Sequence, residues 1–276
     1  MEVCTVDEKL ESLLKQKGYF QTKDEFKRIT YILEIFASLY PFENLDVLLE
    51  KENPITPSYI TEKMLRRGRG GVCYELNALL YMVLKELGFN VYLASATVES
   101  PKTGWIIDRT HAINIYEKQG KMYVIDSGSG NNLSMAPLEL DGPVVTSPAG
   151  KFRLRTKTTE RGTIVSEKMG EKDWLLRYAF VPTPVGWEDF NRIKKMIHHH
   201  GESPFNKSLL IAQTLPDGTI SVNDERLLRK WSDGTVKKVP FTSEEEKLNT
   251  IKKHFHPSVY EDAVKYVEQK KQQKPI

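Results

Sequence analysis

The apolar residues of this 276-residue chain change their spacing at Gly88, and this change constrains the fold more than any other feature. Before Gly88, apolar side chains recur at helical intervals, as at Leu10, Leu13 and Leu14 and again between Thr22 and Leu39. After it, short runs rich in β-branched and aromatic residues alternate with turns that contain glycine or proline. The runs expected as strands are 90–99, 109–117, 121–126, 152–157, 163–168 and 173–180. The sequence therefore predicts an α+β protein in which a helical unit precedes an antiparallel sheet or barrel.

The later part of the chain indicates further units. A chain of this length is longer than one compact core usually occupies. Pro182–Gly186 interrupts the strand pattern, and a linking helix, a second group of strands over 208–241 and two closing helices over 243–255 and 257–271 follow. We expect a helical domain over 1–88, a β-barrel domain over 89–186, an interdomain helix over 187–200 and an α/β lid over 201–276.

Turn and cap residues divide the helical domain. The residue before a proline avoids helical angles, so Tyr40-Pro41 should end the helix that begins near Thr22, and residues 41–45 should form a loop. Thr56 or Ser58 can cap a helix over 59–66. That helix leads to a glycine stretch.

Cys73 follows this stretch, Arg69-Gly70-Gly71-Val72, and stands in the first turn of a helix expected to run to residue 88. Unpaired backbone N–H groups and the positive end of the helix dipole favour a thiolate over a thiol at such a position. Position alone explains the residue equally well as a small buried side chain.

His111 and Asp126 supply the partners that a cysteine nucleophile needs, namely a base and an acceptor that orients the base. His111 lies near the start of one expected strand and Asp126 at the end of the next, and Lys118-Gln119-Gly120 forms the turn between them. In an antiparallel hairpin the start of the first strand and the end of the second share an edge. Each residue taken singly is explained by a structural role, but the order and spacing of the residues favour a Cys73-His111-Asp126 triad. In this triad the helical domain carries the nucleophile, and the barrel carries His and Asp.

Composition excludes several other classes. The formal charge of +3 does not imply a nucleic-acid partner, although clusters of Lys and Arg remain available for an anionic cofactor. Cys4 and Cys73 are the only cysteines, too few for a disulfide framework or a zinc ribbon, which indicates a reducing compartment. No run is apolar enough for a membrane span or a signal peptide, so we expect a cytoplasmic protein without a membrane partner. The three side chains of His198-His199-His200 diverge on a helix or strand, so we expect a solvated linker and no metal.

Four ordered motifs resemble the arylamine N-acetyltransferases. They are Arg69-Gly70-Gly71-x-Cys73-x-Glu75-x-Asn77, Thr110-His111, Asp126-x-Gly128-x-Gly130 and the loop Pro41-Phe42-Glu43-Asn44-Leu45, with Ser203-Pro204-Phe205 and Asp217-Gly218 similar to the C-terminal region. The resemblance covers nearly the whole chain. It implies a helical N-terminal bundle, a central antiparallel β-barrel and a C-terminal α/β lid, built around a triad core like that of cysteine proteases and transglutaminases. It also implies ping-pong transfer of acetyl from acetyl-CoA, as cosubstrate, through Cys73 to an arylamine, arylhydrazine or arylhydroxylamine.

The resemblance extends to substrate contacts. It implies that Phe42, Ser129 and Asn131 face the acceptor and that Ser203 and Phe205 contact CoA. Ser127 and Ser129 replace the apolar and aromatic residues usual in the family's Asp-Val-Gly-Phe-Gly stretch, so with Asn131 they predict a more polar pocket wall.

Arg69 and Glu75 are expected in structural roles. A glutamate in the first turn caps a helix and interacts favourably with its dipole, and Arg69 is the expected ion-pair partner of Glu75.

Two rivals remain open at this stage. A transglutaminase-like acyltransferase or hydrolase uses the same order of triad residues, and a degenerate family member would bind CoA or an aromatic ligand without turnover. A papain-like protease fits poorly, because its histidine is expected about 130–150 residues after the cysteine. The sequence allows either a monomer or a homodimer.

Overall fold

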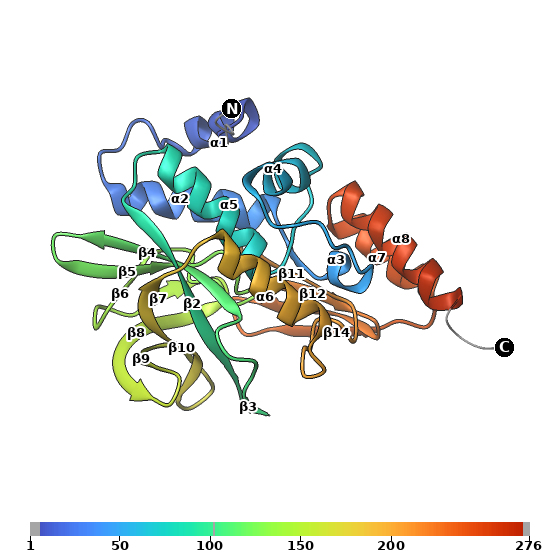
Figure 1. The fold of residues 1–276 in the computed structure, drawn as a ribbon. Coiled ribbons are helices and arrows are strands. Elements are labelled where there is room, and N and C mark those ends of the chain that lie inside the picture. Colours follow the sequence, from blue (N-terminus) through green and yellow to red (C-terminus); the bar gives the residue numbers. More distant parts are fainter. Residues whose placement is uncertain (1–5, 102, 273–276) are drawn as a thin grey trace.

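The computed structural model describes residues 6–101 and 103–272 and has an α+β architecture. Helices of the N-terminal region lie over a β-barrel, and a second sheet lies beside the barrel with the C-terminal helices α7 and α8 (Figure 1). None of the helices formed by these residues combines the length and the apolar character that a membrane crossing requires.

The N-terminal helices follow the predicted apolar spacing. They are α1 (Glu8–Lys17), α2 (Glu25–Leu39), α3 (Leu45–Leu48), α4 (Pro57–Ile60), the π-helix η1 (Thr61–Arg66) and α5 (Cys73–Glu86). Asp24 accepts hydrogen bonds from the N–H groups of Phe26 and Lys27 and so caps α2. Thr56 caps α4 through the N–H of Tyr59, as one of the two expected caps. The expected helix over 59–66 instead begins at Pro57 and changes to the wider π form at Thr61.

The barrel is a sheet with the strand order β6-β5-β4-β2-β10-β9-β8-β7, and β3 pairs with β2. Its strands are β2 (Val91–Ser100), β3 (Gly104–Trp105), β4 (His111–Lys118), β5 (Lys121–Ile125), β6 (Leu138–Glu139), β7 (Val145–Ser147), β8 (Gly150–Thr159), β9 (Gly162–Met169) and β10 (Trp174–Pro184). A parallel bridge between Leu140 and Leu154 nearly closes the sheet. Alternate residues that face inward form an apolar core that includes Ile113, Val124 and Phe180.

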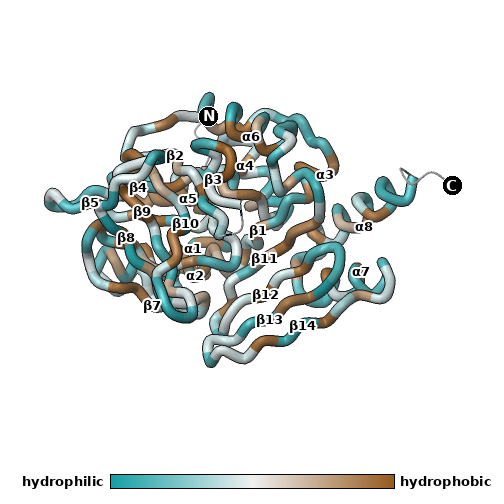
Figure 2. Tube along the Cα trace, turned by 90° about the horizontal axis from the view of Figure 1, so that it is seen from below, coloured by the Kyte–Doolittle hydropathy of each residue, from teal (hydrophilic) through white to brown (hydrophobic). Residues whose placement is uncertain are grey.

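The second sheet has the order β1-β11-β12-β13-β14, and Figure 2 shows these strands in succession away from the barrel. They are β1 (Phe42–Glu43), β11 (Leu210–Leu215), β12 (Gly218–Asn223), β13 (Arg226–Trp231) and β14 (Val236–Pro240). The sequence predicted only a loop at residues 41–45, and this is corrected: Phe42 and Glu43 pair with Ala212 and Ile211. Two residues are too few to show a strand period. The pairing joins the N-terminal region to the C-terminal sheet.

Three helices complete the fold. Helix α6 (Trp187–His199) links the two sheets, and α7 (Glu244–His254) and α8 (Pro257–Gln272) follow the second sheet. Residues from α3, β11, β12, α7 and α8 share an apolar cluster, with Leu45, Ile211 and Val259 among its buried members.

A buried ion cluster around Arg69 ties α8 to the N-terminal helices. The fully buried Arg69 guanidinium contacts Glu43 Oε1 at 2.6 Å and Asp46 Oδ1 at 3.1 Å, and it also bonds Asp262 of α8. The expected ion pair between Arg69 and Glu75 is therefore wrong. Glu75 folds back over the start of its own helix, where it accepts the Val72 N–H at 3.1 Å and pairs with Lys63 at 2.7 Å.

Candidate active site

The start of α5 places Cys73 at the junction of the helices and the barrel. The helix begins at Cys73 itself, so Cys73 stands in the first turn as predicted, and the Glu75 carboxylate caps the helix by accepting the N–H of Val72. The chain reaches this point through a close approach of two backbones, because a Cβ built on Gly70 would lie 1.8 Å from the Pro41 carbonyl oxygen. Cys73 is buried, and its Sγ donates to the Thr110 carbonyl oxygen at 3.4 Å.

The predicted hairpin brings His111 and Asp126 together. Strands β4 and β5 pair antiparallel from Lys118 and Lys121 at the turn to Asn114 and Ile125, so the start of β4 and the end of β5 share an edge. His111 Nε2 lies 2.9 Å from Asp126 Oδ2, and both side chains are buried. Nε2 is thus occupied by the aspartate, and Nδ1 is the ring nitrogen that can serve Cys73.

The electrostatics of the pair favour an imidazolium. Burial by itself would lower the pKa of His111, but the Asp126 charge and the hydrogen bonds to Asp126 and Cys73 outweigh it and raise the pKa to about 10. Burial would raise the pKa of Asp126, yet the His111 charge and the hydrogen bonds from His111, Asn77 and Ser129 hold it below its usual range. The arrangement can therefore keep a proton on His111 beside the sulfur.

Asn77, which sequence reasoning quoted in a motif without assigning it a role, fixes the aspartate. Its Nδ2 donates to Asp126 Oδ1 at 2.9 Å and to the Ala112 carbonyl at 2.6 Å, and its Oδ1 accepts the Ser127 N–H at 3.0 Å. A helix places residues four apart on one face, so the spacing from Cys73 could have indicated this contact.

Gly128 allows the loop after β5 to lie against the start of α5. A Cβ built there would lie 2.5 Å from Asn77 Nδ2 and 2.7 Å from the Cys73 Cα, so no larger residue fits without movement. The Gly128 N–H donates to Asp126 Oδ1 at 2.7 Å and adds a further donor to the carboxylate.

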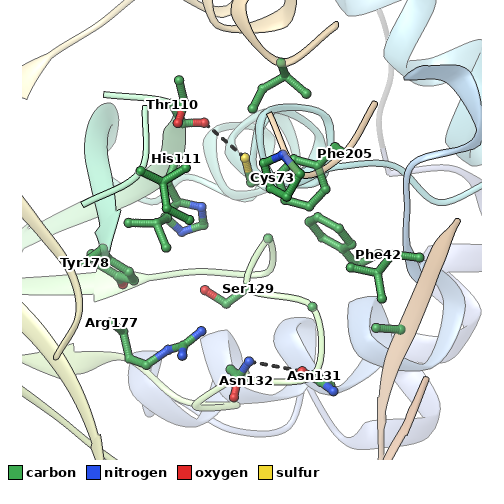
Figure 3. A pocket seen from close by; sticks show the side chains of 18 residues that line it. Phe42, Cys73, Thr110, His111, Ser129, Asn131, Asn132, Arg177, Tyr178 and Phe205 are labelled. Carbon is green, nitrogen blue, oxygen red and sulfur yellow. Dashed lines mark hydrogen bonds between the residues drawn. The ribbon is translucent and has the colours of Figure 1, made fainter. Parts of the chain in front are cut away.

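A cavity of about 210 Å³ opens beside Cys73 and His111 (Figure 3). Phe42 and Phe205, with ring centroids 5.4 Å apart, form one side of it. Polar residues line the opposite part: Ser129, Asn131, Asn132 and Arg177. Of the expected substrate contacts, Phe42, Ser129, Asn131 and Phe205 line this cavity.

Ser203 is fully buried outside the cavity lining. Its Oγ donates to the Ile197 carbonyl at 2.6 Å and accepts the Phe205 N–H at 3.3 Å. It holds the turn that presents Phe205 to the cavity.

Ser127 and Ser129 were both expected to make the pocket wall polar, but the structure gives their hydroxyl groups other hydrogen-bond partners. Ser127 is buried away from the cavity, where its Oγ donates to the Leu76 carbonyl at 3.2 Å, so its contribution to the wall is corrected. Ser129 does line the cavity, but its Oγ donates to Asp126 Oδ2 at 2.7 Å. The polar wall therefore depends mainly on Asn131, Asn132 and Arg177.

Tyr178 is a further neighbour of the triad that sequence reasoning missed. It lines the cavity, and its ring lies 5.0 Å from the His111 ring, centroid to centroid. It comes from β10, which joins this part of the barrel only through its pairing with β2. Nothing in the sequence spacing marks that pairing.

A second cavity of about 300 Å³ adjoins the first through Asn131 and Asn132. Three lysines line it, Lys151, Lys168 and Lys230, together with Trp231. Burial, followed by the charges of Arg177 and Lys230, lowers the pKa of Lys168 to about 8. This cavity is a concentration of positive charge next to the triad.

His198 is not part of a solvated linker, contrary to the sequence expectation. It is buried on α6, directly after the buried Ile197, and its Nε2 lies 3.3 Å from the Tyr74 hydroxyl oxygen. Burial, with the Lys194 charge, lowers its pKa to about 4. His199 and His200 are exposed. Among residues 6–101 and 103–272, no three His, Cys, Asp or Glu side chains are grouped so that they could hold a metal ion.

Comparison with known proteins agrees with this architecture. The N-acetyltransferase family model matches residues 25–264. An uncharacterized acetyltransferase of Bacillus subtilis (strain 168) is 34% identical over an alignment of 249 residues that covers 89% of this chain and 97% of that protein. The structure of arylamine N-acetyltransferase C from Bacillus anthracis has a TM-score of 0.79 and 33% identity, covering 87% of this chain and 97% of that chain.

A second similar structure is an arylamine N-acetyltransferase from Bacillus cereus, described as having a unique Cys-His-Glu catalytic triad. It has a TM-score of 0.78 and 32% identity, covering 88% of this chain and 97% of that chain. In the present chain the residue bonded to His111 is an aspartate. The matched family model and these two structures show that the chain belongs to the arylamine N-acetyltransferase family and is an acyltransferase.

Proposed function

We propose that this chain transfers the acetyl group of acetyl-CoA to the nitrogen of an arylamine, arylhydrazine or arylhydroxylamine by a ping-pong mechanism through an acetyl thioester on Cys73. The observation that carries the proposal is the buried sequence of contacts from Cys73 to His111 to Asp126 at the wall of a cavity lined by Phe42 and Phe205. A nucleophile, a base and an orienting acid in this arrangement are what acyl transfer requires.

In the first half-reaction, Cys73 Sγ, as the thiolate beside the His111 imidazolium, attacks the acetyl carbonyl carbon. The bond from that carbon to the CoA sulfur then breaks, and the CoA thiolate takes the proton from His111. In the second half-reaction, the acceptor nitrogen attacks the thioester and loses a proton to His111 Nδ1, while Cys73 leaves as the thiolate. Asp126 holds Nε2 throughout and stabilises the imidazolium.

The lysines of the second cavity are the groups that fit the phosphates of CoA. Lys151, Lys168 and Lys230 supply positive charge next to the triad cavity, and phosphates bind where such charge gathers. Ser203 and Phe205 were both expected to contact CoA. Of these two residues we keep only Phe205 as a proposed contact, since it lines the triad cavity.

Mass spectrometry of the protein mixed with acetyl-CoA alone tests this function. We expect one acetyl adduct on the peptide that contains Cys73, stable until an arylamine is added, and no adduct in Cys73→Ser. An adduct that decays to acetate as fast without an amine as with one would identify a hydrolase. No adduct on Cys73 at all would identify a binding protein without turnover.

A further inference from the structure

Arg177 reaches the triad cavity through an irregularity in β10. The pairing of β10 with β9 shifts register between Leu176 and Tyr178, so Arg177 is an extra residue in its strand. Bulges of this kind re-aim side chains and are common beside active sites. Successive strand residues normally face opposite sides of a sheet, yet both Arg177 and Tyr178 line the triad cavity. Figure 3 shows the Arg177 guanidinium directed towards Ser129 and Asn132.

The guanidinium has no partner within the part of the chain that the structure describes. No hydrogen bond or ion pair of its side chain is formed there, whereas Arg153 on β8, the strand beyond β9, pairs with Glu167 of β9 at 2.6 Å. Asp126, the nearest acid of the triad, already accepts hydrogen bonds from four donors. Burial is the largest influence on Arg177, and it lowers the pKa of this side chain. The charges of Tyr178, Glu99 and Asp126 favour the protonated guanidinium but do not outweigh burial. A half-buried cation that no carboxylate contacts directly favours an anionic ligand.

The size of the cavity limits that ligand to a small one. A cavity of about 150 Å³ holds benzene, so about 210 Å³ accommodates one aromatic ring with a small substituent. The cavity presents Cys73 and His111, the aromatic pair Phe42 and Phe205, and the cation Arg177. An arylamine can place its nitrogen at the sulfur only if its remaining groups suit the other walls.

We propose that Arg177 determines acceptor specificity by binding the carboxylate of a single-ring arylamine such as an aminobenzoate. The inference rests on the proposed function, because it assigns the acceptor of the same site. A guanidinium binds a carboxylate through two parallel hydrogen bonds, which a lysine cannot reproduce. The arrangement gives Arg177 a role separate from that of the lysines in the second cavity.

Transfer from a pre-formed acetyl-enzyme tests the inference without CoA. The protein is acetylated with p-nitrophenyl acetate, and loss of the Cys73 adduct is followed with 4-aminobenzoate and with the neutral isostere 4-aminobenzamide. We expect the second-order rate constant of wild type to favour the carboxylate, and Arg177→Met to reduce the carboxylate-to-amide ratio about 10- to 100-fold, as expected for a hydrogen-bonded ion. Comparison of the ratio between proteins cancels the different nucleophilicities of the two amines. Arg177→Lys should recover only part of the ratio.

Lys230→Met is the matched control, because it removes one exposed positive charge from the neighbouring cavity and leaves Arg177 in place. It should leave the ratio unchanged, which separates direct contact from the general positive field. An equal ratio in wild type and Arg177→Met overturns the inference. So does an Arg177→Met variant that is acetylated more slowly by acetyl-CoA but not by p-nitrophenyl acetate, since Arg177 would then bind a CoA phosphate.

Binding of benzoate to the unacetylated protein, measured by calorimetry, keeps the inference separate from the proposed function. Even if Cys73 is never acetylated, benzoate should bind wild type about 10- to 100-fold more tightly than Arg177→Met. Equal affinities would contradict the role of Arg177 whether or not the protein transfers acetyl groups. Failure of the proposed function would instead be seen as the absence of an acetyl adduct on Cys73 of the wild-type protein.

Discussion

Replacing Asp126 with asparagine should disable the histidine while changing only one atom of the site. Asp126 Oδ1 accepts from Asn77 and Gly128, so that position must remain an oxygen in the variant. The new amide NH₂ then faces His111 Nε2 and Ser129 Oγ. Two N–H donors cannot face each other, so the His111 proton must move to Nδ1, where it blocks the nitrogen that serves Cys73.

The size of the effect follows from the electrostatics of His111. The rise of its pKa from 6.5 to about 10 corresponds to a preference of roughly 5 kcal/mol for the imidazolium. Without the aspartate charge, burial, which is the largest influence on the ring, lowers its pKa and only the contacts with Cys73 oppose it, so we expect the variant histidine to be neutral at neutral pH. The corresponding change in serine triads reduces turnover about 10⁴-fold, and we expect a loss of about 10³ to 10⁴ in the rate of Cys73 acetylation.

The same shift predicts how stability depends on pH. A group whose pKa is raised by folding stabilises the protein fully below its unfolded pKa and loses that contribution as the pH rises through the folded value. The His111 contribution should thus be present below pH 6.5 and be lost towards about pH 10. The difference in unfolding free energy between wild type and Asp126→Asn should shrink across that window.

Two measurements check the prediction. Acetylation by p-nitrophenyl acetate gives the rate directly, and alkylation by iodoacetamide, read by peptide mass spectrometry, reports the thiolate. In wild type, Cys73 should be alkylated rapidly even at mildly acid pH; in the variant its rate should rise only near pH 8 to 9, as for ordinary thiols. Ser129→Ala, which removes one donor to Asp126 but keeps its charge, is the control and should lose less than about tenfold. A variant that keeps a tenth of wild-type activity, or an unchanged alkylation profile, would refute the role assigned to Asp126.

Three other changes test the site and its surroundings. Gly128→Ala should abolish acetylation, because the added Cβ would lie 2.5 Å from a neighbouring amide nitrogen. Gly201→Ala is the control and should leave acetylation unchanged, because nothing lies within 4 Å of the added Cβ. Equal acetylation rates in the two variants would show that the loop after β5 moves freely. Asp262→Asn should lower the unfolding free energy by about 3 kcal/mol in denaturant titrations, because it removes a buried partner of Arg69, and a loss below about 0.5 kcal/mol would show that the ion pair contributes nothing. Ser129→Phe should shift acceptor kcat/KM towards apolar arylamines, and an unchanged ratio of polar to apolar amines would dissociate this loop from acceptor choice.

Most of the fold could be predicted from apolar spacing and turn residues. The long helices and strands begin and end within a few residues of the predicted bounds, as for α5 at Cys73 and the β4–β5 hairpin. The short strands β1, β3, β6 and β7 could not be predicted, because two or three residues show no period and are ordered by their partners. The division into four units stays a prediction. The pairing of β1 with β11 shows that elements of the first and last units share one sheet.

The site could be predicted where its residues lie close in the chain or belong to a motif. The proposed triad residues Cys73, His111 and Asp126 were predicted from a helix start and one hairpin, and the structure brings His111 and Asp126 within 2.9 Å. Arg177 and Tyr178 could not be identified in this way. They reach the cavity because β10 pairs with β2 and carries a bulge, and neither the partner of a strand nor the position of a bulge can be read from alternation alone.

The serine at position 129 acts on the triad as well as on the acceptor wall, and its two effects can be separated. Its hydroxyl donates to the same oxygen of Asp126 that binds His111, which helps to hold the carboxylate ionised. Ser129→Ala removes only that hydrogen bond, so it should slow acetylation of Cys73 slightly and leave the ratio of acceptors unchanged. Ser129→Phe removes the hydrogen bond and also adds apolar surface to the cavity. Its change in the ratio of acceptor rates, divided by the change that Ser129→Ala causes, therefore measures the contribution of the cavity wall alone. Since the remaining polar wall consists of Asn131, Asn132 and Arg177, acceptors with a carboxylate should stay among the substrates of Ser129→Phe, whereas the combined change with Arg177→Met should exclude them.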